Sequence, residues 1–157
     1  KIIKIMITKE EVLDVQKQWS DGLLKIVAKH QNNEDFTSEA SGFIDELYAY
    51  SYGEVLFKPT LATDVQFRLN KAAALSYFVA GNPGFSEDKG FALKGWTNVR
   101  WENSAIKLEE NFAFAMGNYY FGNSDGEIKV EFSFAYKKDN NGKLKIILHD
   151  SHFPYQK

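Results

Sequence analysis

Apolar residues in the first third of the chain recur at helical spacing. Thr8 followed by Glu11 matches a capping box, the pattern that opens a helix. The apolar positions that follow are Val12, Val15, Trp19, Leu23, Ile26 and Val27. Their separation of three or four residues predicts a helix over residues 9–30 with one apolar face, ended by Asn32-Asn33.

Two more helices and a short strand are predicted before residue 81. A second helix, capped by Thr37 or Ser38, carries apolar residues at Phe43, Ile44, Leu47 and Tyr48. Gly53 interrupts that pattern, and residues 54–57 read as a short strand stopped by Pro59. An alanine-rich segment predicts a third helix over residues 68–80, followed by the turn signal of residues 81–84.

The second half of the chain alternates with the period of strands. Strands are predicted over residues 99–101, 105–120, 128–136 and 144–152. The run 105–120 has Phe112, Phe114 and Met116 on one parity, and Phe132, Phe134 and Tyr136 share a face of the next strand. Asn123-Ser124-Asp125-Gly126 and Asp139-Asn140-Asn141-Gly142 predict hairpin turns. Helices followed by an antiparallel meander predict a single α+β domain over residues 1–157, with a curved sheet wrapped around the N-terminal helices.

Composition removes several classes of function. The chain has 157 residues, 44% hydrophobic, with a net charge of −2, so we expect no nucleic-acid partner and no attraction to an anionic membrane. The absence of cysteine excludes disulfides, thiolate metal sites and cysteine nucleophiles. Residues 1–7 are too short an apolar stretch for a signal peptide, which predicts a cytoplasmic protein, or a periplasmic one if a signal peptide has been trimmed.

The polar residues at the end of the last strand are the first candidates for chemistry. In His149-Asp150-Ser151-His152, alternation places His149 and Ser151 on one face and Asp150 and His152 on the other, which argues against a metal site built from this segment alone. Local sequence favours a turn residue at Thr60 and a core aromatic at Tyr77. The charged clusters Glu87-Asp88-Lys89 and Glu109-Glu110 are expected to be solvated.

Several strings resemble the iota-class carbonic anhydrase family, from residue 9 nearly to the end of the chain. They are Val55-Leu56-Phe57-Lys58-Pro59-Thr60, Gln66-Phe67-Arg68, Ala74-Leu75-Ser76-Tyr77-Phe78, residues 87–92, residues 96–103 and residues 115–121. Family members also carry the label of phosphoribosyl-AMP cyclohydrolase, but the three cysteine ligands expected for that activity are absent. The resemblance implies a SnoaL-like (ketosteroid-isomerase-like) cone, often a homodimer, that interconverts carbon dioxide and bicarbonate.

The resemblance also implies the site residues. Its metal-free form predicts that Thr60, Tyr77 and Ser151 hold bicarbonate and that no cofactor is needed, with zinc or manganese as the alternative. Hydroxyl groups are poor bases near neutral pH, so neutral His149 is the candidate base. The family tail reads His-His-Ser-Ser, and Asp150 and His152 depart from it. If His149 and Ser151 face the pocket, its lining is unchanged.

Two other functions fit the same fold. One is a member that binds a small ligand without turnover, since a cone fold does not determine chemistry. The other is an assembly domain like that of calcium/calmodulin-dependent kinases, although this chain has no attached kinase.

Overall fold

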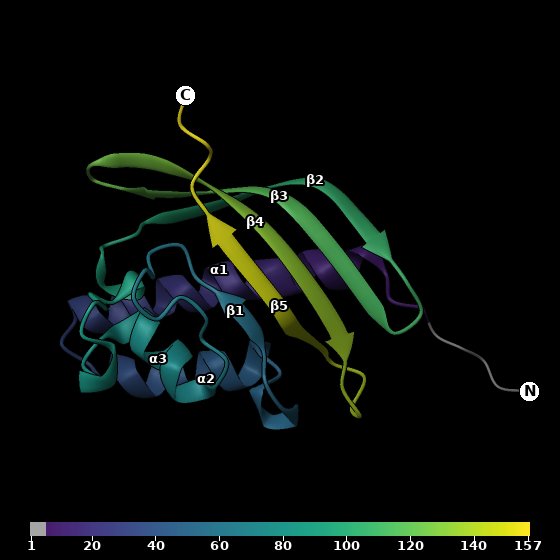
Figure 1. Cartoon of the computed structure of the whole chain (residues 1–157), viewed down its shortest axis with the longest axis horizontal. Coiled ribbons are helices and arrows are strands. Elements are labelled where there is room, and N and C mark those ends of the chain that lie inside the picture. The colour runs from purple at the N-terminus through teal and green to yellow at the C-terminus, as the bar shows by residue number, and fades with distance from the viewer. Residues whose placement is uncertain (1–5) are drawn as a thin grey trace, which may run out of the picture.

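The computed structural model describes residues 6–157, and helices cover one face of a curved sheet (Figure 1). The helices are α1 (Lys9–Gln31), α2 (Phe36–Leu47) and α3 (Lys71–Val79). The strands are β1 (Leu56–Lys58), β2 (Asn98–Leu108), β3 (Phe112–Asn123), β4 (Gly126–Lys138) and β5 (Leu144–His152). Short 3-10 turns occupy Tyr50–Tyr52, Pro83–Phe85 and Phe91–Leu93. The predicted α+β class is confirmed.

The described strands form one sheet in the order β1-β5-β4-β3-β2. Neighbours from β2 to β5 are antiparallel, whereas β1 pairs in parallel with β5 at the sheet edge. In this pairing Phe57 lies opposite His149 and Lys58 opposite Asp150. The chain that leaves β1 therefore runs beside the end of β5, which brings Thr60 to Ser151.

Helix starts follow side-chain capping. The capping box of Thr8 and Glu11 is present as predicted. The caps predicted for the second helix, Thr37 or Ser38, are wrong: Asp35 is the cap, and its carboxylate accepts hydrogen bonds from the backbone and hydroxyl of Ser38. The third helix begins at Lys71 rather than residue 68, because Asn70 caps it.

The predicted strand 105–120 is two strands. A tight connection at residues 109–111 separates β2 from β3, and the Glu109 amide donates to the Phe112 carbonyl across it. Both predicted hairpin turns are present, between β3 and β4 and between β4 and β5. On β3 large and small side chains alternate. The large Phe112, Phe114 and Met116 face outward, and the small Ala113 and Ala115 are buried.

An aromatic core fills the space between sheet and helices. Trp19 of α1 lies at its centre, buried, with its ring between 5.8 and 6.4 Å from six others. These rings belong to Phe43, Phe78, Trp101, Tyr119, Phe121 and His149. The core is therefore continuous with the residues at the end of β5, and packing holds their side chains in place.

Candidate active site

A small cavity lies above this aromatic core, where β5 ends beside the segment that follows β1. Its walls are mostly apolar. Four hydroxyl groups and the His149 imidazole are polar, and the hydroxyls belong to Thr60, Tyr77, Tyr119 and Ser151. The lining residues are Trp19, Phe57, Pro59, Thr60, Tyr77, Phe78, Phe91, Tyr119, His149 and Ser151. Its free volume of about 10 Å³ is close to the roughly 10–15 Å³ that one water needs. Thr60 is half-buried and the other lining residues are buried, so Thr60 marks the rim.

Three hydroxyl groups meet in this cavity at short range. The Thr60 Oγ1 lies 2.5 Å from the Ser151 Oγ, and the Ser151 Oγ lies 2.6 Å from the Tyr119 hydroxyl oxygen. Thr60 lies on the turn just after β1, Ser151 lies on β5, which pairs with β1, and Tyr119 comes from the inward parity of β3. Such a cluster can donate hydrogen bonds to a small anion in surroundings that exclude bulk water.

Tyr77 supplies a fourth hydroxyl from α3. Its ring is buried and stacks on Phe91, with ring centroids 5.7 Å apart. The Leu61 amide donates to the Tyr77 hydroxyl at 3.3 Å. Burial raises the pKa of Tyr77 well above its ordinary value, and burial raises that of Tyr119 in the same way. Both hydroxyls therefore keep their protons and act as donors near neutral pH.

His149 is enclosed between two aromatic rings and two tyrosine hydroxyls. Phe57 and Phe134 stack on the imidazole, with centroids 4.8 and 4.1 Å away. The Nδ1 lies 2.9 Å from the Tyr48 hydroxyl, and the Nε2 lies 2.9 Å from the Tyr119 hydroxyl. Burial lowers the pKa of His149 from 6.5 to about 3.

This geometry weighs against the prediction that His149 acts directly as the base. Both ring nitrogens already have hydrogen-bond partners, so neither is free to contact a water in the cavity. A conjugate acid with a pKa of about 3 is also too acidic to hold a proton near neutrality. The lowered pKa keeps the imidazole neutral near pH 7, and its Nε2 lies within hydrogen-bond distance of the Tyr119 hydroxyl.

The sequence did not single out Tyr48, Tyr119 or Trp19 as site residues. Trp19 Nε1 donates to the Tyr48 hydroxyl at 2.9 Å, which extends the polar chain into the core. The pattern of apolar positions assigned Trp19 and Tyr48 to the buried faces of helices. That pattern does not distinguish them from core phenylalanines, because it ignores the indole nitrogen and the phenol oxygen. Tyr119 shares its parity with the buried Ala113 and Ala115, a signal that period-two alternation offered.

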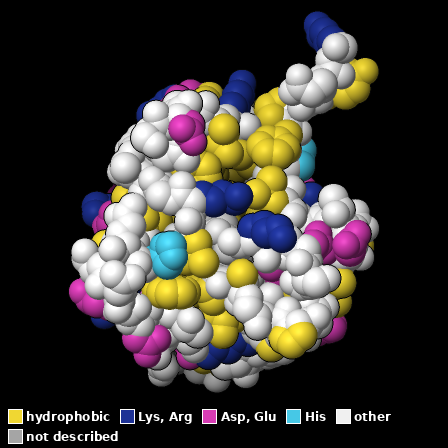
Figure 2. Space-filling view, turned by 90° about the vertical axis from the view of Figure 1, so that its left-hand side faces the viewer, with side chains coloured by type: hydrophobic (Ala, Val, Ile, Leu, Met, Phe, Trp, Pro, Cys, Tyr) yellow, Lys and Arg dark blue, Asp and Glu magenta, His cyan; other side chains and the backbone are white. Residues whose placement is uncertain are grey.

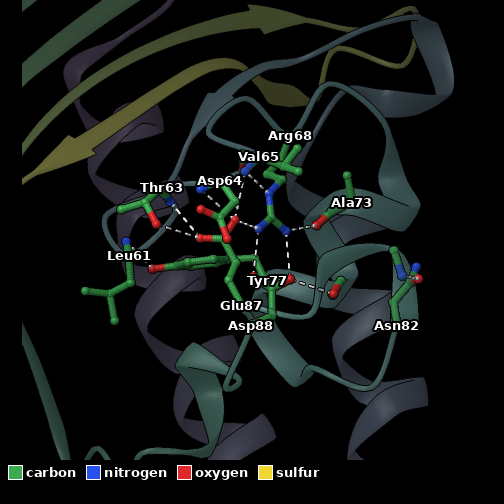
Figure 3. A network of polar contacts seen from close by, with 12 residues as sticks. Leu61, Thr63, Asp64, Val65, Arg68, Ala73, Tyr77, Asn82, Glu87 and Asp88 are labelled. Atoms are coloured by element: carbon green, nitrogen blue, oxygen red, sulfur yellow. Dashed lines mark hydrogen bonds and ion pairs between the residues drawn. The ribbon is translucent and has the colours of Figure 1, made fainter.

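The loop that follows Thr60 is held by a buried ionic network (Figure 3). The Glu87 carboxylate accepts hydrogen bonds from the amides of Thr63, Asp64 and Val65, at 2.7 to 3.0 Å. The hydrogen bonds from the Thr63 and Val65 amides, in that order of effect, hold the pKa of the Glu87 carboxyl down to about 2. Three amides bound to one carboxylate fix the shape of this loop.

Arg68 anchors the other side of the same network. Its guanidinium is fully buried and binds both oxygens of Asp88, at 2.7 and 2.8 Å. Ser76 of α3 donates to Asp88 at 2.6 Å. The prediction that Glu87-Asp88-Lys89 is a solvated cluster is therefore wrong for its two acids, because backbone amides and a buried arginine compensate their charge.

The two departures in the tail lie away from the cavity. His149 and Ser151 are buried, whereas Asp150 is half-buried and His152 is exposed. His152 Nδ1 approaches Asp150 at 3.3 Å on the outer face of the sheet. The cavity lining is therefore unaffected by either departure.

Neither a metal site nor a membrane span is found in the described part of the chain. Residues 6–157 contain no group of three or more His, Asp or Glu side chains placed to hold a metal ion. No helix in that range is long and apolar enough to cross a bilayer.

On the end of the molecule drawn in Figure 2, Lys or Arg side chains lie beside hydrophobic ones near the centre, with Asp and Glu toward the edges.

Comparison with known proteins shows which family the chain resembles. A family model described as metal-independent carbonic anhydrase matches residues 10–153. A metal-independent carbonic anhydrase from Nostoc sp. is 40% identical over 159 residues, which cover 99% of this chain and 78% of the relative. The crystal structure of a cyanobacterial iota-carbonic anhydrase complexed with bicarbonate superposes with a TM-score of 0.95 at 38% identity, covering 100% of this chain and 98% of that one.

More distant structures show the fold alone. An NTF2-like protein of unknown function from Shewanella oneidensis has a TM-score of 0.61 at 13% identity, covering 93% of this chain and 99% of that one. The cone architecture predicted from the sequence is thus confirmed. With a family model matched over nearly the whole chain and a relative at 40% identity, this chain belongs to the metal-independent carbonic anhydrase family.

Proposed function

We propose that this chain catalyses the reversible hydration of carbon dioxide to bicarbonate in the cavity between β5 and the segment after β1, without a metal ion. The observation that carries the proposal is the meeting of Thr60, Tyr77 and Ser151 in one apolar cavity of a chain from this family. The Thr60–Ser151 contact of 2.5 Å joins the turn after β1 to the end of β5, 91 residues later in the sequence.

The cavity favours the reaction by binding and by electrostatics. As a water oxygen bonds to the carbon of carbon dioxide, electrons of one C=O bond move onto oxygen, and negative charge develops there. Hydroxyl protons of Thr60 and Tyr77 can donate to those oxygens, and each hydrogen bond to a charged group contributes about 1.5–3 kcal/mol. The proton lost by the attacking water leaves to solvent at the rim.

Binding requires a small movement at the rim. Bicarbonate has four non-hydrogen atoms, while the cavity has room for about one water. Thr60 is the half-buried member of the lining, so an outward shift there enlarges the cavity without disturbing the aromatic core.

Stopped-flow measurement of carbon dioxide hydration tests the proposal. Thr60→Ala, Tyr77→Phe and Ser151→Ala should each lower kcat/KM by about 10- to 100-fold, the effect of one lost hydrogen bond to developing charge. Tyr52→Phe on the exposed 3-10 turn and Ser133→Ala on the outer face of β4 are matched controls that should keep the wild-type rate. Bicarbonate binding without turnover by the wild type would instead identify a binding protein.

We also propose that the protein is a homodimer. The outer face of β3 exposes Phe112, Phe114 and Met116, with 39%, 41% and 56% of each residue accessible. Large apolar side chains that share one strand face are typical of an interface. Light scattering should give twice the chain mass, and Phe114→Lys should give the mass of a single chain.

A further inference from the structure

The polar atoms around His149 form one continuous hydrogen-bond chain, and the end of it that lies in the core is cut off from solvent. The chain runs from Trp19 through Tyr48, His149, Tyr119 and Ser151 to Thr60, with contacts between 2.5 and 2.9 Å. Indole nitrogen can only donate, so the Tyr48 oxygen accepts from Trp19. Trp19, Tyr48 and Tyr119 are all buried, and the inner end of the chain has no contact with solvent.

Because the indole can only donate, it fixes the donor and the acceptor in each of the other hydrogen bonds, from Tyr48 to Thr60. The single Tyr48 proton has the Nδ1 of His149 as its acceptor. The opposite arrangement, with a proton on Nδ1, would leave the buried Tyr48 proton without an acceptor, which is costly. Neutral His149 therefore carries its proton on Nε2 and donates it to the Tyr119 oxygen.

The same direction continues to the cavity. Since Tyr119 accepts from His149, its own proton goes to the Ser151 Oγ, and the Ser151 proton goes to the Thr60 Oγ1. The Thr60 proton is then left for the cavity, where the Tyr77 hydroxyl is its neighbour. The side chain at the rim is thus a donor, which suits an oxyanion.

We propose that Tyr48 is a positioning residue, which fixes the Nε2–H tautomer of His149 and so makes Thr60 present a proton to bicarbonate. The proposal rests on the proposed function for its ligand. It assigns no proton transfer to the chain: the donor-only indole blocks the inner end, so no proton leaves by that route. Tyr48 acts from the far side of the imidazole and does not line the cavity.

Loss of the Tyr48 hydroxyl should reverse the chain. In Tyr48→Phe the Nδ1 of His149 loses its only donor, so the free-energy gap that excluded the Nδ1–H tautomer narrows and that tautomer becomes accessible. Tyr119 can then donate to Nε2, Ser151 to Tyr119, and Thr60 to Ser151. Thr60 would offer the cavity only a lone pair, and the oxyanion would lose one donor.

Nitrogen-15 NMR of the His149 ring tests the proposal independently of activity. The wild type should show a proton-bearing Nε2 and an unprotonated Nδ1. Tyr48→Phe should populate the Nδ1–H form and lower kcat for carbon dioxide hydration by about 2- to 10-fold, because only molecules that keep the Nε2–H form present the Thr60 donor.

Tyr136→Phe is the matched control. Tyr136 is also fully buried, and its hydroxyl makes no hydrogen bond within accepted geometry to the described residues. Burial raises the pKa of Tyr136, and the nearby Gln16 amide, which opposes this shift, is already paired with Asn103. This variant should keep both the Nε2–H tautomer and the wild-type kcat.

The outcomes separate this proposal from the proposed function. A proton on Nδ1 in the wild type overturns it, even if Tyr48→Phe fails to fold. A folded Tyr48→Phe that keeps the Nε2–H form and the wild-type kcat overturns it as well. A third outcome separates the two proposals. The wild type has the Nε2–H form and Tyr48→Phe shifts the tautomer, but neither protein hydrates carbon dioxide. The positioning role of Tyr48 then stands and the carbonic anhydrase function fails.

Discussion

Acid should weaken this fold through the buried His149. Burial lowers the pKa of His149 to about 3 in the folded protein, against 6.5 in the unfolded chain. Below pH 6.5 the unfolded chain therefore binds a proton that the folded protein does not, and stability falls as the pH falls. From pH 6.5 to pH 4, about 2.5 pH units at about 1.4 kcal/mol each amount to about 3 kcal/mol.

This loss is a large share of the roughly 5–15 kcal/mol that stabilises a typical domain. The measurement is urea denaturation at several pH values between 7 and 4, for the wild type and for His149→Gln. The variant keeps a hydrogen-bonding nitrogen but cannot titrate. Glu87, whose pKa is also lowered, contributes equally to both proteins and cancels in the difference.

We expect the variant to be less stable at pH 7 and to lose about 3 kcal/mol less than the wild type by pH 4. Parallel stability curves for the two proteins would refute the reasoning, because they would mean that His149 titrates normally in the folded state.

Four further predictions follow from the same contacts. Asp88→Asn removes the carboxylate that pairs with fully buried Arg68 and should lower the free energy of unfolding by about 3–5 kcal/mol in urea titrations. Gly117→Ala would place a Cβ 2.1 Å from a backbone carbonyl of β2 and should cost about 1–3 kcal/mol, whereas Gly42→Ala on α2, with nothing within 4 Å, should raise the melting temperature slightly. Dialysis against a chelator should leave the carbon dioxide hydration rate unchanged, and a rate restored only by added zinc or manganese would contradict this. The dependence of kcat/KM on pH should show no inflection near 6.5, because His149 is neutral throughout that range.

Local chemistry made much of the fold predictable. Strand alternation alone placed His149 and Ser151 on one face, and the structure buries both while Asp150 and His152 lie outside. Two hairpins were predictable because their turns contain glycine after polar residues. The hairpin at residues 109–111 was missed because Glu109-Glu110-Asn111 has no such residue, and alternation continues on both sides of it.

Partners distant in sequence account for the rest of the site. Glu87 and Asp88 have the composition of a solvated loop, and only the approach of residues 63–68 buries them. Tyr48 is separated from His149 by 101 residues, so their hydrogen bond leaves no local signal. The roles of Thr60 and Tyr77 were suggested by resemblance and not by local pattern, and they stay predictions until the variants are measured.

The position of β1 ties catalytic competence to a three-residue strand at the edge of the sheet. β1 has three residues, lies at the sheet edge, and delivers Thr60 to Ser151 through its pairing with β5. Edge strands of this length open by local fluctuation at a free energy below that of global unfolding. Each opening would separate the two hydroxyls at once, so mild heat or denaturant should silence the enzyme while most of its amides remain protected from hydrogen exchange.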